Sequence, residues 1–316
     1  MKTDILPAGD SATIRRASAA LRAGDPVALP TETVYGLAAD ALNPRACARI
    51  FEAKERPLYD PLIVHLPGLE WLERVAVVNV AALRLAQEFW PGPLTMVLPR
   101  RGIVPDIVTS GQETVAVRMS AHPVFRQIAL NTGTPLAAPS ANRFGRISPT
   151  IAAHVLAELD GRIELIVDGG PCTHGIESTI VLVAEDHFEI LRHGPITEAD
   201  LEKFAPVCAP ERADIAAPGN LKSHYAPTTP LDIVTELPAG RENIGLLAWR
   251  PVEAAGFAAV ETLSQSGDLR EVAANLYAGM RRLDARGLTR ILALPVPEEG
   301  LGAAIMERLR KAAARE

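Results

Sequence analysis

The sequence has few cysteines and no long apolar run. Its three cysteines lie far apart and form no CxxC pair, which argues against a disulfide framework and a structural zinc site. No segment reaches the roughly 18 unbroken apolar residues that a membrane-spanning helix needs. The opening residues, MKTDILPAGD, contain no apolar core of a secretion signal. We therefore expect a soluble, cytoplasmic protein that does not contact membranes.

The chain also carries fewer positively than negatively charged residues. The 316 residues carry 32 Lys and Arg against 38 Asp and Glu, a formal net charge of −6. Proteins that bind nucleic acid broadly usually have a basic surface, so this balance argues against that class but leaves room for a local basic pocket. With 48% hydrophobic residues the chain has enough apolar side chains for a folded core, and its length favours two domains.

Periodic patterns divide the chain into two regular regions with an irregular stretch between them. Residues 1–205 mix helix and strand patterns without a strict βαβ rhythm, which predicts a mixed sheet with helices packed on it. Residues 206–230 are rich in proline and show no sustained period, which favours a linker or a lid. Residues 231–316 predict a small α/β domain of Rossmann-like character, without the GxGxxG motif of dinucleotide binding.

Caps and spacing predict most of the individual elements. Asn43 and Pro44 begin a helix that ends near Lys54, and Thr150 is expected to cap a helix that ends near Gly161. The other expected helices cover residues 11–23, 80–89, 125–131, 269–286 and 303–313, with a short one capped by Thr197. The expected strands cover residues 27–29, 62–66, 94–98, 114–119, 136–138, 164–167, 179–183, 188–191, 231–235, 244–248, 258–262 and 290–294.

A polar cluster follows the expected strand 27–29. The segment 30–36, Pro-Thr-Glu-Thr-Val-Tyr-Gly, comes directly after this strand, and Lys54 and Arg56 leave a helix end one residue apart. Two cations so placed suit a polyphosphate or a carboxylate, since arginine binds such groups in a bidentate way and lysine acts as a point charge. The same pair could instead cap the helix C-terminus, and spacing alone does not decide between the two.

Two further polar loops follow expected strands. Residues 139–150 are rich in hydroxyls and arginine and end at a helix N-terminus, where backbone N–H groups favour anions. An ordinary connection with a Ser or Thr cap accounts for the same residues. Residues 169–179 form a polar turn in which Ser178 is either a ligand contact or a turn hydroxyl. The chain has no GxxxxGK(S/T) motif, so neither loop is a P-loop.

The expected strand 114–119 brings two polar side chains together. Because side chains alternate along a strand, Thr114 and Arg118 share one surface and the valines between them face the other. Along the whole chain no nucleophile stands convincingly beside a base, and the seven histidines show no metal-ligand spacing such as HExxH. Cations and hydroxyls without a catalytic dyad favour chemistry run by positioning and charge neutralisation, such as nucleotidyl or phosphoryl transfer.

Several short motifs follow one another in order along the larger region. They are Leu29-Pro-Thr-Glu-Thr-Val-Tyr-Gly-Leu37, Lys54-x-Arg56-Pro57, Pro61-Leu-Ile-Val-His65, Pro91-Gly-Pro-Leu-Thr95, Thr114-Val-Ala-Val-Arg118, Ala138-Pro-Ser-Ala-Asn142 and Gly175-Ile-Glu-Ser-Thr179. Together they closely resemble the YrdC-like family, and residues 223–227, Ser-His-Tyr-Ala-Pro, resemble the linker of its long, two-domain form, the threonylcarbamoyl-AMP synthases. The resemblance implies an α/β fold with a curved mixed sheet and helices around an open, positively lined cavity.

The resemblance also implies an activity. Members of this family join L-threonine, bicarbonate and ATP to give threonylcarbamoyl-adenylate and pyrophosphate. The product feeds the modification of tRNA through a downstream threonylcarbamoyl-transfer complex. The implied protein is a nucleotidyltransferase that uses ATP with Mg²⁺ and has ATP, L-threonine and bicarbonate as partners, while direct binding of tRNA is left open.

Individual residues take their expected roles from the same resemblance. Threonine is expected to contact Thr33, His65, Arg118, Ser178 and the backbone of Ala138. ATP is expected to contact Lys54, Arg56, Asp60, Thr114, Ser140, Asn142, Ser148, Arg192 and Tyr225. Lys54 and Arg56 form the expected catalytic pair, which neutralises phosphate charge, and no protein ligand is assigned to the metal.

Two positions depart from the family pattern. Asp60 stands where the family often has Asn, and its carboxylate would repel phosphates unless it holds magnesium or pairs with a cation. His193 replaces the Pro that commonly follows the arginine equivalent to Arg192, which leaves the orientation of that arginine open.

The irregular stretch 206–230 carries Tyr225 beside His224. A carbamate is short-lived and an adenylate is a reactive mixed anhydride, so water must be kept from both during turnover. We expect this stretch to fold over the cavity, with Tyr225 on the nucleotide and the C-terminal domain anchoring its far end.

Two other functions remain as alternatives. A YrdC-like domain also occurs in carbamoyltransferases that mature hydrogenases and use carbamoyl phosphate, but those are much longer chains with paired-cysteine zinc motifs. A non-catalytic RNA-binding module is the second alternative. The net charge of −6 and the presence of Lys54, Arg56 and Arg118 argue against it.

Overall fold

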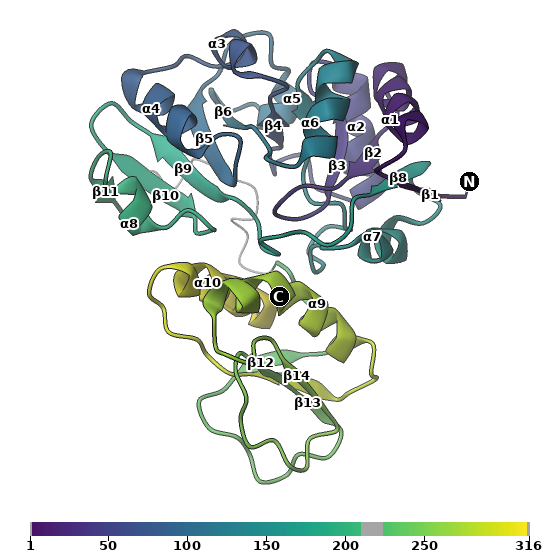
Figure 1. The fold of residues 1–316 in the computed structure, drawn as a ribbon, viewed down its shortest axis with the longest axis vertical. Coiled ribbons are helices and arrows are strands. Elements are labelled where there is room, and N and C mark those ends of the chain that lie inside the picture. The colour runs from purple at the N-terminus through teal and green to yellow at the C-terminus, as the bar shows by residue number, and fades with distance from the viewer. Residues whose placement is uncertain (1, 210–223, 315–316) are drawn as a thin grey trace.

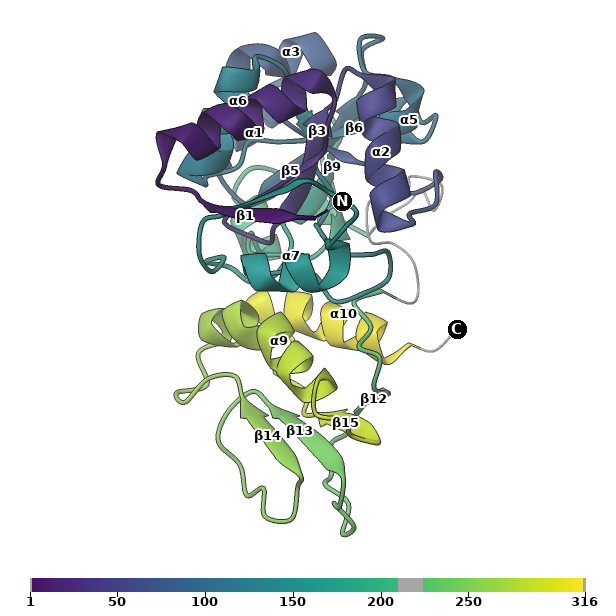
Figure 2. The same ribbon diagram turned by 90° about the vertical axis from the view of Figure 1, so that its right-hand side faces the viewer.

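A computed structural model describes residues 2–209 and 224–314, which form two α/β bodies. The larger body is built on an 11-stranded sheet and the smaller on a 4-stranded sheet. Figure 1 shows the smaller body below the larger one, and Figure 2 shows the same arrangement from the side. Residues 210–223 of the expected linker, which include Ser223 of its motif, lie outside the described residues. None of the described helices is long and apolar enough to cross a membrane.

The large sheet is mixed, as the sequence predicts. Its strands are β1 (Asp4–Pro7), β2 (Val27–Leu29), β3 (Gly36–Asp40), β4 (Ile63–His65), β5 (Leu94–Pro99), β6 (Thr114–Arg118), β7 (Leu136–Ala137), β8 (Leu165–Asp168), β9 (Thr179–Val183), β10 (Phe188–Arg192) and β11 (Val207–Cys208). They lie in the order β1-β8-β2-β3-β7-β4-β6-β5-β9-β10-β11. β4 pairs with β6 in parallel, whereas β5 pairs with β6 in the antiparallel sense.

Side-chain caps mark the starts of several helices of the larger body. The helices of this body are α1 (Ser11–Ala23), α2 (Pro44–Lys54), the 3₁₀ turn η1 (Leu69–Trp71), α3 (Leu72–Val75), α4 (Val80–Phe89), α5 (Asp106–Thr109), α6 (Pro123–Thr132), α7 (Ala152–Leu159) and α8 (Glu198–Leu201). The Asn43 side chain caps α2, and Thr197 forms a capping box with Asp200 at α8. The expectation for Thr150 is wrong: α7 begins after Ile151, and the Thr150 hydroxyl lies 3.4 Å from His154 Nδ1.

Alternation along β6 decides where polar side chains can gather. Val115 and Val117 belong to the main apolar core, whereas Ala116 packs with Ile63 of β4 on the other face of the sheet. Arg118 follows Ala116 at a spacing of two residues and therefore lies on that second face. Figure 1 shows α2, α5 and α6 on the side of the sheet away from the smaller body. The second face is thus left for a binding site.

The smaller body is a parallel α/β unit, as predicted. Its strands are β12 (Leu231–Ile233), β13 (Ile244–Ala248), β14 (Ala259–Thr262) and β15 (Arg290–Ala293), and its helices are α9 (Leu269–Asp284) and α10 (Leu301–Ala313). All neighbours in the order β12-β15-β13-β14 are parallel. Figure 2 shows α9 and α10 between the small sheet and the larger body, so these helices form the surface that meets it.

The two bodies are in close contact along α9. Gly175 of the larger body has φ +70°, and a Cβ added to it would lie 2.4 Å from the Ala274 Cα on α9. Tyr225 packs in the same apolar cluster as Tyr277 of α9 and Ile176 of the larger body. The bodies therefore share one buried interface, and a side chain at position 175 would force them apart.

We predict that Gly175→Ala destabilises the protein more than Gly170→Ala does. Both glycines have positive φ, so both variants carry the strain of about 1–2 kcal/mol that a Cβ meets in this conformation. Gly170 has no atom within 4 Å of an added Cβ, so only Gly175→Ala adds the overpacking cost of about 1–3 kcal/mol. Urea unfolding of the two variants measures the difference. Equal losses would show that the bodies do not pack tightly at this glycine.

Candidate active site

A cavity lies at the ends of β4 and β6, on the sheet face that carries Ala116. Its wall comes from the segment after β2, the loop after β7, the turn before β9, the end of β10 and two residues of the expected lid. The lining residues are Thr31, Thr33, Val34, Gly36, Arg56, Ile63, His65, Arg118, Ala138, Pro139, Ser140, Glu177, Ser178, Arg192, His224 and Tyr225. Nine of the fourteen residues predicted from the sequence are among them.

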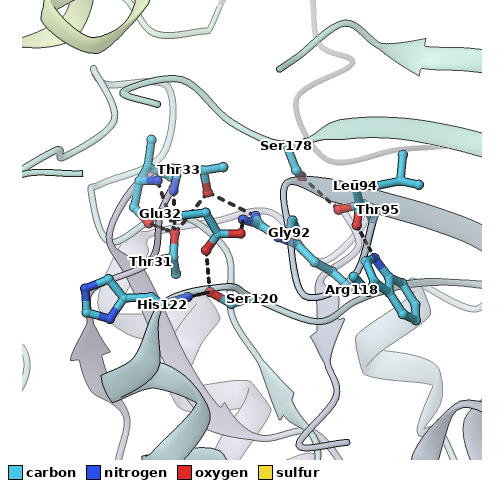
Figure 3. Close-up of polar contacts among 12 residues, drawn as sticks. Thr31, Glu32, Thr33, Gly92, Leu94, Thr95, Arg118, Ser120, His122 and Ser178 are labelled. Carbon is cyan, nitrogen blue, oxygen red and sulfur yellow. Dashed lines mark hydrogen bonds and ion pairs between the residues drawn. The ribbon is translucent and has the colours of Figure 1, made fainter. Parts of the chain in front are cut away.

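Arg118 is fixed at one end of this cavity by three contacts, which Figure 3 shows. Its Nη2 donates to Glu32 Oε1 at 2.6 Å, its Nη1 to Thr33 Oγ1 at 3.0 Å and its Nε to the Gly92 carbonyl at 3.2 Å. A guanidinium has five N–H donors, so two remain for a ligand. The arginine is thus held in one orientation with a fork that suits a carboxylate.

Glu32 is the counter-charge of this arginine. Burial alone would raise its pKa, but the charge of Arg118 and hydrogen bonds from Ser120 and Arg118 lower the pKa of Glu32 to about 2. The carboxylate is therefore ionised at neutral pH, and the pair is neutral before any ligand binds. Ser120 Oγ donates to the second carboxylate oxygen, so both oxygens of Glu32 are engaged (Figure 3).

Ser178 is a lining residue that two side chains hold in place. Its hydroxyl lies 2.8 Å from Thr95 Oγ1 and accepts from Arg192 Nη2 at 3.0 Å. Arg192 Nε also donates to the Ser178 carbonyl at 3.1 Å. His193, which departs from the family pattern, binds Glu307 through its backbone and its ring instead. The orientation of Arg192 is therefore set by Ser178 and does not need a proline at position 193.

Arg56 has its own carboxylate partner. Its Nη2 lies 2.9 Å from Asp60 Oδ2, and both side chains are buried. Nε and Nη2 also donate to the carbonyls of Asp60 and Pro61 at 3.1 and 2.8 Å. Asp60 thus pairs with a cation, which removes the repulsion that its charge would otherwise exert on phosphates.

His65 presents a neutral ring to the cavity. Burial, followed by the charge of Arg118, lowers the pKa of His65 to about 3. The ring packs on Phe125 with centroids 4.8 Å apart, and Nδ1 has no hydrogen-bond partner among the described residues. The free lone pair of a neutral imidazole accepts a hydrogen bond, so His65 is suited to an N–H or O–H group of a ligand.

His224 and Tyr225, two residues of the expected lid, line one side of the cavity. Their exposed fractions are 5% and 1%, and their rings lie 4.2 Å apart. Tyr225 has φ 62°, an uncommon backbone conformation for a non-glycine residue that is often kept at functional sites. Ala226 N donates to the Gly145 carbonyl at 2.9 Å, which ties this segment to the larger body.

Comparison with known proteins places this geometry in a family. Residues 19–194 match the family described as "Telomere recombination", and residues 196–314 match "Threonylcarbamoyl-AMP synthase, C-terminal domain". The chain is 42% identical to the threonylcarbamoyl-AMP synthase of Pyrococcus abyssi over 95% of this chain and 93% of that protein. It is 41% identical to that of Bacillus subtilis over 98% and 95%. The crystal structure of P. abyssi Sua5 complexed with L-threonine superposes with a TM-score of 0.89 at 38% identity, covering 98% of each chain.

The chain belongs to the threonylcarbamoyl-AMP synthase family. Both family matches and the full-length similarity agree on the long, two-domain form, as the motifs predict. The fold expected from the resemblance, a YrdC-like α/β body with a smaller C-terminal α/β domain, is confirmed by the superposition.

Five residues that the resemblance assigns to ATP are not among the lining residues of the cavity. They are Lys54, Asp60, Thr114, Asn142 and Ser148. Lys54, 1% exposed, donates through Nζ to the Ser140 and Asn142 carbonyls, both at 2.5 Å, and so shapes the loop after β7. Ser148 Oγ donates to Glu177, and Thr114 lies at the far end of β6. Lys54, Asp60 and Ser148 thus contact lining residues, and direct contact of all five residues with ATP stays a prediction.

Sequence reasoning did not assign several residues that line the cavity or contact its lining residues. Glu32 and Glu177 stand inside recognised motifs, but only the fold shows that each is the partner of an arginine. Thr95 also stands in a motif, and it is the partner of Ser178. His224 precedes the predicted Tyr225, yet nothing in the sequence shows that its ring lies in the wall. Arg308 comes from α10 and carries no motif at all.

We predict that the stability lost in Glu32→Gln depends on pH. The pKa of Glu32 is lower in the folded chain than its usual value of 4.5, so its stabilisation is complete above that pH and fades as pH falls toward about 2. Removing one partner of a buried pair costs about 3 kcal/mol near neutral pH. Urea unfolding of the variant and the parent chain at several pH values, from about 7 down to about 3, measures the difference in their free energies of unfolding.

An exposed variant, Glu88→Gln, is the control, since Glu88 lies on the exposed side of α4. It should match the parent chain at every pH. A loss in Glu32→Gln that stays constant down to the acid end would contradict the assigned ion pair.

Proposed function

We propose that this chain joins L-threonine, bicarbonate and ATP to give threonylcarbamoyl-adenylate and pyrophosphate. The observation that carries the proposal is one cavity in which Arg118, Thr33 and His65 lie at one end and Arg56 and Arg192 line the same wall. A single fixed arginine suits the carboxylate of an amino acid, and a pair of arginines suits a polyphosphate. The similarity of the chain to threonylcarbamoyl-AMP synthases over nearly its full length supports the same reaction.

The reaction needs positioning more than it needs a base. The ammonium group of threonine combines with bicarbonate, which releases one water and one proton and forms a carbamate. A carbamate oxygen then attacks the α-phosphorus of ATP, a new P–O bond forms, and the bond to the β-phosphate oxygen breaks to release pyrophosphate. The attacking oxygen is already anionic, so the wall supplies orientation and positive charge.

Magnesium is proposed to enter with ATP. The carboxylate among the lining residues, Glu177, has oxygens engaged by Ser148, Tyr277 and Arg308, and Asp60 is paired with Arg56. The described part of the chain holds no group of three or more His, Cys, Asp and Glu side chains placed for a metal. The wall therefore does not fit a protein-held magnesium site, and the proposal leaves the ion on the phosphate oxygens, whose charge it neutralises.

The adenylate is proposed to pass to a downstream threonylcarbamoyl-transfer complex that acts on tRNA in the cytoplasm. A mixed anhydride is hydrolysed quickly, so it must be consumed by a transfer step near its source. The net charge of −6 favours tRNA contact by that partner over broad binding by this chain.

We predict that the purified protein releases pyrophosphate only when ATP, magnesium, L-threonine and bicarbonate are all present. A coupled pyrophosphate assay with each component left out in turn measures this dependence. Equal release when carbamoyl phosphate replaces threonine and bicarbonate would overturn the proposal in favour of carbamoyltransferase chemistry. No release under any condition, with nucleic acid bound instead, would favour the RNA-binding alternative.

Arg118→Ala is predicted to weaken threonine binding far more than ATP binding. A charge-assisted contact in a buried site contributes roughly 1.5–3 kcal/mol, which is about tenfold to a hundredfold in affinity. Calorimetric titration with each substrate measures the two effects. Glu32→Gln is the control, since it removes the same ion pair but leaves the arginine. Unchanged threonine affinity in Arg118→Ala would refute the role of this arginine.

A further inference from the structure

Glu177 is a buried carboxylate in the cavity wall that both bodies hold. Ser148 Oγ, from the larger body, donates to its Oε1 at 2.5 Å. The Tyr277 hydroxyl on α9 and Arg308 Nε on α10 donate to its Oε2 at 2.8 and 3.0 Å. The smaller body therefore supplies two of these three donors and the charged one among them.

Arg308 is buried at the junction of the bodies, with no exposed surface. Its guanidinium carbon lies 5.6 Å from the centre of the Tyr225 ring, which in turn stacks on Tyr277 with centroids 5.6 Å apart. Its other carboxylate neighbour, Glu307, is 3.5 Å away and has a second cation, Lys311, at 2.8 Å. Arg308 is thus placed to compensate Glu177 and to pack against the lid residue Tyr225 at once.

The charge of Glu177 affects which ligand the cavity can bind. Glu177 lines the cavity next to Ser178 and Arg192, where the proposed function places anionic phosphates. Burial would raise the pKa of Glu177, but Arg308 and Arg192, together with the Ser148 hydrogen bond, hold it below its usual value, so the group stays ionised. An ionised carboxylate without its cation would repel a polyphosphate strongly in a site shielded from water.

We infer that Arg308 is a positioning residue through which the smaller body completes the nucleotide subsite. It neutralises Glu177 and holds Tyr225 against the cavity, so the wall accepts a polyphosphate only when the two bodies are docked. The inference rests on the proposed function for the identity of the ligand. It gives the C-terminal domain a role in ATP binding that the motifs of the larger body do not contain.

Arg308→Met tests the inference directly, and Arg281→Met is its matched control. Arg281 also crosses the junction from α9, pairing with Glu158 at 3.2 Å, but it does not line the cavity or contact Glu177. Calorimetric titration of the full-length variants with ATP and with L-threonine separates the two subsites. Arg308→Met is expected to weaken ATP binding about tenfold or more and threonine binding by less than about threefold, because one uncompensated charge faces the phosphates. Arg281→Met is expected to bind both like the parent chain.

A second substitution distinguishes charge from general damage. In Glu177→Gln/Arg308→Met both charges are gone, so no uncompensated carboxylate remains and ATP affinity should recover from that of Arg308→Met alone. Recovery supports the inference. Equal ATP affinity in Arg308→Met and the parent chain, or a double variant that binds no better than Arg308→Met, would overturn it.

Glu177→Gln keeps the test decisive if Arg308→Met does not fold. It removes the carboxylate and leaves Arg308 beside the Tyr225 ring. ATP binding at least as tight as that of the parent chain, with unchanged threonine binding, supports the inference, and ATP binding weakened about tenfold or more would overturn it. Failure of the proposed function would give a different result. A parent chain that binds ATP but releases no threonine-dependent pyrophosphate would refute the reaction, and the ATP affinities of the variants could still be compared.

Discussion

Charge compensation inside a buried wall is the constraint on which the rest of the structure depends. A cavity for anions needs arginines, but an arginine buried without a counter-charge is strongly unfavourable when no ligand is bound. Arg118 is paired with Glu32 and Arg56 with Asp60. The same requirement applies in reverse to Glu177, whose charge is balanced by Arg308. These paired cations are already oriented by their carboxylates, so anion binding costs little reorganisation.

The fold satisfies this constraint by bringing distant segments to one edge of a sheet. β4 and β6 run in parallel with His65 opposite Arg118, so these two wall residues are fixed by backbone register. The segment after β2 carries Glu32 to Arg118, and β9 follows directly on Ser178. Helices on the far side of the sheet leave this face to the smaller body, whose α9 and α10 supply the remaining partners of Glu177.

The sequence predicts local features well because caps and periodicity act over a few residues. Asn43 begins α2 and Gly24 ends α1 at the predicted places, and α4, β9 and β13 have their predicted bounds. β3 was missed, since its Gly-Leu-Ala-Ala-Asp has low strand propensity and is a strand only because β2 and β7 flank it. Thr150 resembles a cap but bonds elsewhere, because α7 begins one residue later than its pattern indicates.

The residues of the candidate site were likewise predictable only in part from the sequence. Motif resemblance found Thr33, His65, Arg118 and Ser178, which all line the cavity. It did not distinguish side chains that line the wall from those behind it, such as Lys54 and Ser148, because that difference is set by tertiary contacts. The role of Arg308 could not be predicted from the sequence, since this residue is separated from Glu177 by 131 positions and belongs to no motif.

The central claim is that this cavity joins threonine, bicarbonate and ATP in one product. Mass spectrometry of a short reaction with carbon-13-labelled bicarbonate tests it most directly, because it identifies the product and the source of its carbamoyl carbon. The account predicts a threonylcarbamoyl-adenylate whose mass is raised by the label and which is absent without threonine. An unlabelled adenylate, or no adenylate while ATP is consumed, would contradict it.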